Sequence, residues 1–579
     1  MYLCARIKNN VNFYTEMKKT LFFVMSAALV LTGCSKLGNL TSKDFKVTPT
    51  PLVEQGSEVP AQVTVTFPQK FMKKKAQVTM TPVLRYQGGE AAGQSVSFQG
   101  EKVEGNGTTV NYKQGGMHNM RANFRYTPDM LKSDLYMTFD ARKGKKAVKM
   151  PDVKIGYGIL ATEDLLGRCL DKSGAALAPD QFQRIIQQKQ EANIKFLIGQ
   201  ANLRTSELQS VGIRDLARVL KEINDDAEGR ALEAIEVSAY ASPDGSYLVN
   251  ERLAERRQNV SADYLKKELK KIKMDANIDT RYTAEDWDGF QELVKQSNLQ
   301  DKQIILSVLS MYDDPEEREQ QIRNMSHIYT DIKDGILPEL RRARLIVNYE
   351  IIGRSDEEIV AQYKQDPSKL SVEELVYGAN VLVEDPAQQK QWNQTIQRLY
   401  PNDYRALNNL AQLAYNEGDY QQAANYLQQA KNVNTKAAEV NTNLALMALR
   451  EGNLQQAENY LAQGFGANTY NEVMGSYNLA KGNYQQAAQN LMGAKTNTAA
   501  LAQLLSQDYA AARQTLAYVK KADATTAYLQ AILAARTGDT STLVNSLRQA
   551  FDKDASLKAR AKDDLEFASY ASTIASLLK

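Results

Sequence analysis

One short phrase occurs three times in the C-terminal third of the sequence. Gly-Asp-Tyr-Gln-Gln-Ala begins at Gly418, Gly-Asn-Leu-Gln-Gln-Ala at Gly452 and Gly-Asn-Tyr-Gln-Gln-Ala at Gly482. The first two glycines are 34 positions apart, and helical apolar spacing precedes and follows each glycine. The glycine permits a tight turn between two helices, and the alanine lets those helices approach closely. A period of this length predicts helix pairs that stack into a solenoid, because one pair alone cannot bury its apolar face.

The phrase and its period resemble the tetratricopeptide (TPR) repeat, and we assign residues 353–579 to TPR-like helical repeats. An earlier helix pair is expected at about 355–400. In this family the first helices of the pairs line a concave groove that holds an extended peptide or a partner's helix. The resemblance therefore implies a protein partner in the groove. The residues expected on or just before the first helices are Asn408, Asn409, Tyr415, Asn441 and Asn443.

A second informative segment is 235–265, IEVSAYASPDGSYLVNERLAERRQNVSADYL. An alternating apolar run predicts a strand, Pro243 and Gly245 predict a turn, and helical spacing follows. The segment resembles the peptidoglycan-associating domain of the OmpA-like family. In that family an aspartate in the turn and an arginine in the helix together bind the diaminopimelate of peptidoglycan.

The resemblance implies a ligand site at this strand-to-helix turn. Asn250 and Arg257 match the asparagine and the binding arginine of the family, whereas Ser242 stands at the aspartate position. The nearest acid is Asp244, two residues later. Losing the charged partner of a diaminopimelate ammonium would cost about 1.5–3 kcal/mol of binding free energy. Contact through Asp244 and loss of the ligand both remain open, and the helix arginines could instead form a solvated face.

We expect the OmpA-like domain at 190–352, with a β-α-β-α-β order and a helical insertion at about 283–338. The family core lacks this insertion, which could cover the ligand groove or present a new surface. Before this domain, alternating runs separated by glycine-rich breaks predict a β-sandwich of roughly seven strands at 59–157. Residues 158–189 are expected to form a helical linker. The predicted fold is therefore multidomain: an N-terminal β-sandwich, a central α/β OmpA-like domain and a C-terminal α-solenoid.

The N-terminal region carries an export signal. Residues 17–33 combine two lysines, an apolar run too short to span a membrane and a small-residue box before Cys34. The box resembles that of bacterial lipoproteins, which implies a lipidated Cys34 as the mature N-terminus. Residues 1–16 are then a mis-assigned extension, and 34–58 a tether. Ser35 and the lack of a following acidic cluster favour the periplasmic leaflet of the outer membrane.

Composition restricts the function. The formal net charge is +3 and the chain has two histidines. The near balance of charge argues against a nucleic-acid-binding protein, and the scarcity of histidine disfavours histidine-based metal or acid–base chemistry. No metal-ligand spacing, nucleophile elbow or phosphate loop is present, so we expect no catalytic residue, no cofactor and no metal.

These expectations lead to two hypotheses for a non-catalytic, membrane-anchored scaffold. In the first, the protein links the outer membrane to peptidoglycan while the TPR groove recruits a protein partner. In the second, the OmpA-like domain is a protein-interaction module, and the chain is an accessory subunit of an outer-membrane assembly or secretion complex. Ser242 and the helical insertion favour the second hypothesis.

Overall fold

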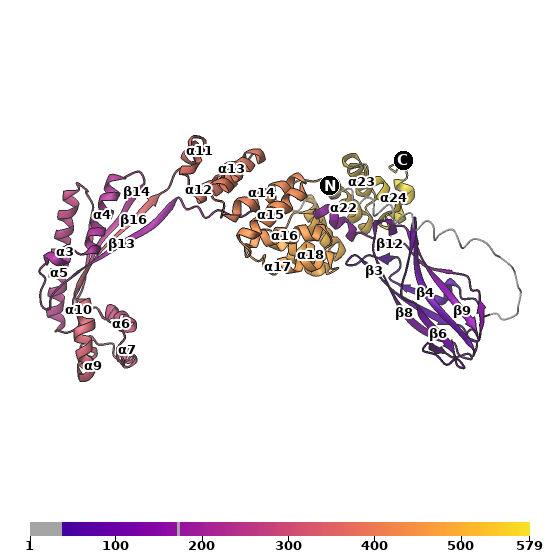
Figure 1. Cartoon of the computed structure of the whole chain (residues 1–579), viewed down its shortest axis with the longest axis horizontal. Helices are drawn as coiled ribbons and strands as arrows, with labels where there is room; N and C mark the ends of the chain where they lie inside the picture. Colours follow the sequence, from indigo (N-terminus) through magenta and orange to yellow (C-terminus); the bar gives the residue numbers. More distant parts are fainter. Residues whose placement is uncertain (1–36, 171–173, 579) are drawn as a thin grey trace. The chain divides into compact units, whose positions relative to one another are not determined.

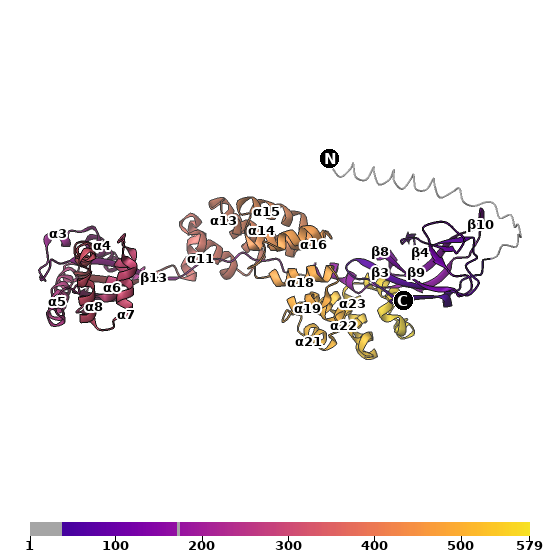
Figure 2. The same cartoon turned by 90° about the horizontal axis from the view of Figure 1, so that it is seen from below.

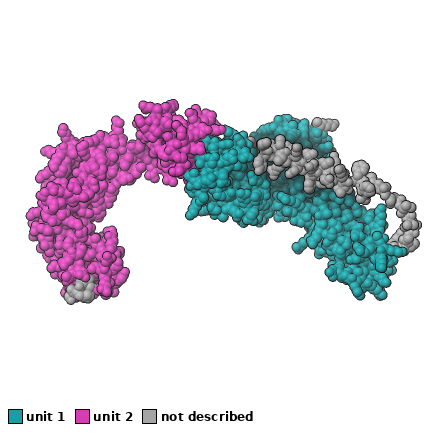
Figure 3. Space-filling model, viewed as in Figure 1, with its two compact units in different colours: residues 1–178, 407–579 teal, residues 179–406 magenta. Residues whose placement is uncertain are grey.

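The protein is described by a computed structural model that covers residues 37–170 and 174–578 (Figure 1). Two compact units are present (Figure 3): unit 1 combines Met1–Ala178 with Leu407–Lys579, and unit 2 is Pro179–Ala406. Unit 2 is therefore inserted between two segments of unit 1. The expected signal peptide and Cys34 lie outside the described residues.

The first part of unit 1 consists of two mainly antiparallel sheets around one apolar core. One sheet has the order β1-β3-β8, and the other β10-β9-β4-β6-β7, with β11 beside β9 and β5 beside β4. Every second residue of β3 is buried, as expected for a strand with one face on a core. The strands are β1 (Phe45–Thr48), β2 (Leu52–Val53), β3 (Glu58–Phe67), β4 (Ala76–Tyr86), β5 (Gly89–Ala92), β6 (Val96–Gly100), β7 (Thr108–Val110), β8 (Gly116–Arg125), β9 (Ser133–Lys143), β10 (Lys146–Val148), β11 (Val153–Tyr157) and β12 (Ile159–Leu160).

The sandwich begins earlier than the sequence predicted. The segment 34–58 was expected to be a tether, but β1 pairs with β3, and Phe45 and Val47 are buried in the core. Phe45 and Val47 alternate with exposed residues, as expected for a strand with one face on a core. The tether prediction was wrong for these residues.

In the described part of the predicted helical linker at 158–189, only residues 163–170 are helical. β12 pairs in parallel with β2, and two short helical turns follow, η3 (Glu163–Leu165) and α2 (Leu166–Leu170). Residues 174–178 have no regular secondary structure. We name residues 159–170 and 174–178 the strap. The helical prediction is also wrong for the end of this linker, because β13 begins at Ile185 and pairs with β16 along its whole length.

The repeat region forms the predicted stack of helix pairs (Figure 2). The turn glycines Gly418, Gly452 and Gly482 have φ of 83°, 71° and 75°, which confirms their role. The helices of the described repeat region are α14 (Tyr404–Glu417), α15 (Tyr420–Val433), α16 (Ala438–Arg450), α17 (Leu454–Leu461), α18 (Tyr470–Ala480), α19 (Tyr484–Asn490), α20 (Asn497–Leu505), α21 (Tyr509–Ala517), α22 (Ala524–Thr537), α23 (Thr540–Lys553), α24 (Leu557–Asp563), η7 (Leu565–Tyr570) and α25 (Ala571–Ile574).

Unit 2 contains a four-stranded sheet in the order β13-β16-β14-β15. Apolar residues alternate along the strands, and two helices, α4 and α5, pack on that face. β15 was not predicted; it is parallel to β14, and five of its six residues are exposed. The elements are β13 (Ile185–Lys195), α3 (Thr205–Leu208), α4 (Val211–Asp225), β14 (Arg230–Tyr240), α5 (Tyr247–Lys271), β15 (Ile278–Thr283) and β16 (Arg342–Ile352).

The expected helical insertion is present between β15 and β16 and has its own apolar core around Phe290. A further helical cluster around Trp392 follows β16. We had assigned the chain from 353 onward to the repeats, but this cluster belongs to unit 2. No helix in the described ranges is long and apolar enough to cross a membrane. The helices of both groups are α6 (Trp287–Gln296), α7 (Lys302–Met311), α8 (Pro315–Asn324), α9 (Ser326–Asp331), η4 (Ile332–Ile336), α10 (Leu337–Leu340), α11 (Asp356–Gln365), η5 (Pro367–Lys369), α12 (Val372–Tyr377), η6 (Gly378–Leu382) and α13 (Pro386–Leu399).

Candidate functional site

The asparagines of the solenoid groove bind the backbone of the strap. The Asn443 side chain donates to the Ala176 carbonyl at 2.8 Å and accepts from the Ala176 N–H at 2.5 Å. Asn408 donates to the same carbonyl at 2.9 Å. Two residues along the strap, Asn409 accepts from the Ala178 N–H at 2.8 Å and donates to its carbonyl at 3.3 Å. Side-chain amides that contact both the N–H and the carbonyl of alternate residues suit the binding of an extended peptide segment.

The strap also contacts the later repeats. Tyr415 donates from its hydroxyl to the Leu170 carbonyl at 2.6 Å. Arg168 forms an ion pair with Asp554, and Arg560 pairs with Asp164. Ala175, Ala176 and Ala178 are almost fully buried. The strap therefore fills the part of the groove that these residues line, like a ligand supplied by the chain itself.

This arrangement adds to the sequence expectations. Asn408, Asn409, Tyr415 and Asn443 contact the strap, so the chain itself occupies the part of the solenoid that these residues line. Asn441 does not contact the strap, because its amide donates to the carbonyls of Thr435 and Ala437 at the start of its own helix. The available signal was the run of small residues at 173–178, which forms no helical or alternating pattern and suits a narrow groove.

Two buried carboxyl groups join the sandwich to the strap and the solenoid. Glu54 accepts from the Asp164 N–H at 3.1 Å, and Glu163 accepts from the N–H groups of Gly56 and Ser57. The Tyr484 hydroxyl also donates to Glu163. Burial, reinforced by repulsion from Glu163 and Asp164, raises the pKa of Glu54 to about 8. The Glu54 carboxyl, which links the sandwich to the strap, therefore changes its charge near pH 8.

In unit 2, the polar groups of the β14–α5 turn are paired with each other. Asp244 forms an ion pair with Arg341 at 2.8 Å, and both side chains are nearly buried. The Ser242 hydroxyl donates to Asp244 at 2.7 Å and accepts from Arg341 at 3.1 Å. Asn250 donates to the Gly245 carbonyl at 2.9 Å and so closes the turn. Asp244 thus has an internal cation in place of a ligand ammonium.

Arg257 is completely buried beneath this turn. Its guanidinium donates to the carbonyls of Leu197, Gln200 and Tyr240, at 3.2, 3.0 and 2.9 Å. Burial, together with the nearby Arg341 charge, lowers its pKa to about 10, so the group stays protonated at neutral pH. In this conformation Arg257 joins α5 to the loop after β13 and to the end of β14, and its guanidinium does not reach the surface.

The helical insertion covers the turn. Arg323 of α8 donates to the Asp244 carbonyl at 2.8 Å. Pro243 lies among Trp287, Phe290 and Ile322 of the insertion around a void of only about 10 Å³. Of the two roles left open for the insertion, the structure supports covering. The sequence analysis missed Arg323 and Arg341 as partners of the turn, although Arg341 lies in the basic run that precedes β16.

Apolar side chains are exposed around the same end of the sheet. Leu197 and Ile198 follow β13, and Tyr247, Leu248 and Val249 form the first turn of α5. Their exposed fractions lie between 46% and 65%. The bond from Arg257 to the Leu197 carbonyl ties the loop after β13 to α5. An exposed apolar surface at the rim of a closed polar turn favours a protein partner over a charged small ligand.

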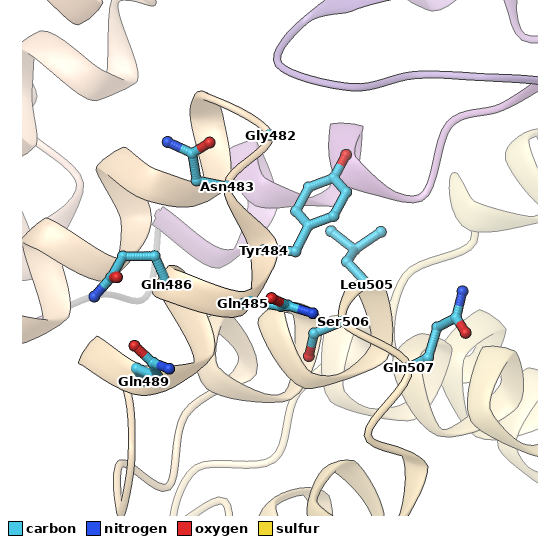
Figure 4. A pocket seen from close by; sticks show the side chains of 9 residues that line it. All are labelled: Gly482, Asn483, Tyr484, Gln485, Gln486, Gln489, Leu505, Ser506 and Gln507. Atoms are coloured by element: carbon cyan, nitrogen blue, oxygen red, sulfur yellow. The ribbon is translucent and has the colours of Figure 1, made fainter.

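The solenoid also has an open, polar cavity of about 780 Å³ at the third turn glycine. Figure 4 shows that its amide side chains point in different directions and do not converge on one place. Within residues 37–170 and 174–578, no cluster of three or more His, Cys, Asp or Glu side chains is arranged to hold a metal ion. The cavity lining consists of Gly482, Asn483, Tyr484, Gln485, Gln486, Gln489, Leu505, Ser506 and Gln507.

No protein-family model and no curated protein matches the chain. Among solved structures, similarity is found to the APC/C hetero-tetramer Cut9–Hcn1, with 15% identity over 35% of this chain and 44% of that chain, at a TM-score of 0.30. A tetratricopeptide repeat protein from Parabacteroides merdae has 12% identity over 43% of this chain and 97% of that chain, at a TM-score of 0.27. PilF of Pseudomonas aeruginosa has 18% identity over 38% of this chain and 100% of that chain, at a TM-score of 0.26. At these scores the similarities carry no functional argument, and the TPR-like assignment depends on the helix pairs themselves.

Proposed function

We propose that the protein is a non-catalytic scaffold of the outer membrane whose unit 2 docks a protein partner. The observation that carries this proposal is the closed β14–α5 turn. Arg257 is buried with three carbonyl partners, Asp244 is paired with Arg341, and the insertion lies over both. A diaminopimelate ligand would have to displace these contacts, and breaking a buried ion pair costs about 3–5 kcal/mol.

The order of β13, α4, β14, α5 and β16 supports an OmpA-like origin for this domain, with β15 as an additional strand, and so does the match at Asn250 and Arg257. The exposed apolar residues beside the turn supply a surface that a protein can cover. Unit 2 would thus keep the framework of a wall-binding domain while its surface contacts a protein. This is the accessory-subunit hypothesis, in which the chain serves an outer-membrane assembly or secretion complex.

Sedimentation with purified peptidoglycan, with and without free diaminopimelate, separates the two hypotheses. We expect no saturable binding by the chain from residue 37 onward. Saturable binding that diaminopimelate abolishes would restore the wall-linking hypothesis. Asp244→Asn is the informative variant, because it weakens a ligand contact if one exists and retains the Ser242 hydrogen bond.

A docking test uses the full-length chain extracted from membranes in mild detergent. We expect it to migrate with a larger complex, and Tyr247→Asp/Leu248→Asp to release it. Met311→Asp is the matched control, because Met311 is 74% exposed on the insertion, away from the turn. Migration of the wild-type chain as a free monomer would contradict protein docking.

Anchoring through Cys34 is a separate part of the proposal. Cys34→Ser should abolish acylation and move the protein from the membrane fraction to the soluble fraction or leave it as an unprocessed precursor. Unchanged acylation and membrane extraction of this variant would refute the anchor. Protection of the wild-type protein from protease added to intact cells would support the periplasmic leaflet.

A further inference from the structure

The loops that join one helix pair to the next lie along one edge of the solenoid. Adjacent loops contact each other: Asn497 donates to Asp523 at 3.0 Å, and the Lys495 ammonium lies 5.1 Å from the centre of the Tyr518 ring. Because each pair stacks only on its neighbours, successive loops of this kind are carried side by side. We name residues 433–437, 462–469, 491–496 and 518–522 the loop edge.

Three successive loops each present one large apolar side chain to solvent. Phe465 and Met492 are 82% and 81% exposed, and Tyr518 is 60% exposed; Val433, at the end of α15, is 39% exposed. A glycine with positive φ follows Phe465 and Met492, so the chain turns away directly after each of them. Single exposed apolar residues are common on proteins. Recurrence in the loops of three successive repeats is a pattern that folding of the solenoid does not require.

The loop edge has a net positive charge. The acid that directly follows its last segment, Asp523, caps α22 and accepts a hydrogen bond from Asn497. Four lysines lie among the apolar residues, and all four are exposed: Lys436, Lys495, Lys520 and Lys521. This combination is complementary to a surface that offers negative charge outside and apolar material a few ångströms deeper.

We propose that the loop edge binds an anionic lipid surface, with Phe465, Met492 and Tyr518 inserted between headgroups and the lysines against the phosphates. The apolar residues are separated by polar loop residues and by one repeat each, so they do not form the continuous apolar core of a protein interface. A headgroup layer accepts such isolated side chains. The inference goes beyond the proposed function, because it concerns unit 1 and does not require the lipid at Cys34.

The test is vesicle sedimentation with the chain from residue 37 onward, which contains the described parts of both units and lacks the apolar segment before Cys34. Vesicles of phosphatidylglycerol with phosphatidylcholine are compared with phosphatidylcholine alone. We expect binding to the anionic vesicles that weakens with salt. Phe465→Ser/Met492→Ser/Tyr518→Ser should reduce it by about tenfold or more. Lys495→Gln/Lys520→Gln should reduce it by about fivefold per lysine.

The matched control is Met117→Ser/Val381→Ser/Met311→Ser, three exposed apolar residues outside the loop edge. It should bind anionic vesicles like the wild type. The proposal fails if the chain binds neither vesicle type or binds both equally. It also fails if the control loses as much binding as the Phe465/Met492/Tyr518 variant. Unchanged vesicle binding together with loss of a co-purifying protein would make the loop edge a protein interface. Peptidoglycan sedimentation is independent of these outcomes.

Discussion

Glu54→Gln should remove much of the pH dependence of the stability of unit 1. The Glu54 carboxyl is 4% exposed, and its pKa is raised from 4.5 to about 8. The folded protein therefore binds this proton more tightly than the unfolded chain does. The contribution of Glu54 to the free energy of unfolding is then greatest below pH 4.5, and it falls as the pH rises toward 8. Integration over the two pKa values gives a loss of about 3–4 kcal/mol in the free energy of unfolding between pH 5 and pH 8.

Glutamine matches the shape of the protonated acid, and its carbonyl can still accept from the Asp164 N–H. The variant should therefore be more stable than the wild type at pH 8 and similar to it at pH 5. Both tryptophans of the chain, Trp287 and Trp392, lie in unit 2. Urea unfolding followed by tryptophan fluorescence thus reports unit 2, whereas far-ultraviolet circular dichroism reports both units.

We expect the Glu54→Gln effect in the circular dichroism transition and not in the fluorescence transition. Glu58→Gln is the control, because Glu58 lies on the neighbouring strand β3 and its side chain is only half-buried. An unchanged pH dependence in Glu54→Gln would refute the assignment of the raised pKa to this residue. An equal gain in Glu58→Gln would show a general effect of charge.

Two further substitutions test the strap and the buried arginine. Asn443→Ala removes both hydrogen bonds to Ala176 and leaves a buried N–H unpaired, so the free energy of unfolding of unit 1 should fall by about 2–4 kcal/mol in urea unfolding followed by circular dichroism. The control substitution at an exposed residue, Asn425→Ala, should have almost no effect. Equal urea midpoints for the two variants would contradict a structural role of the strap. Arg257→Met leaves three carbonyls without their donor, so the free energy of unfolding of unit 2 should fall by about 3–5 kcal/mol in urea unfolding followed by tryptophan fluorescence. The control substitution at an exposed residue, Arg256→Met, should have little effect. A wild-type urea midpoint for Arg257→Met would instead indicate that Arg257 is free for a ligand.

The fold was most predictable where the physical signal is local. The turn glycine, the small residue after it and the period all lie within one repeat, and they predicted the helix pairs. The strap could not be predicted, because its conformation depends on partners far along the chain. Ala176 is held by Asn443, 267 positions away, and the small residues around Ala176 do not by themselves specify an extended conformation.

The candidate site likewise combines features that the local sequence predicts with features that it does not. The strand, the turn and the helix around Asp244 follow from local pattern, and Arg257 was singled out by the resemblance to the OmpA-like family. Its burial was not predictable, because the loop after β13 and the end of β14 surround its guanidinium. Asp244 was likewise considered for a ligand, whereas its partner Arg341 lies 97 positions later.

The insertion of unit 2 into unit 1 has a mechanical consequence. The two chain ends that lead into unit 2 leave unit 1 side by side, since Ala178 is hydrogen-bonded to Asn409, two residues after the start of the second segment of unit 1. A pull on unit 2 is therefore shared between the strap and the first repeat. The strap is held along the solenoid by amide pairs and by ion pairs with Asp554 and Arg560. A tensile load between the membrane and a docked partner, as in the proposed function, would be divided over these contacts. The solenoid would thereby resist extension of the strap.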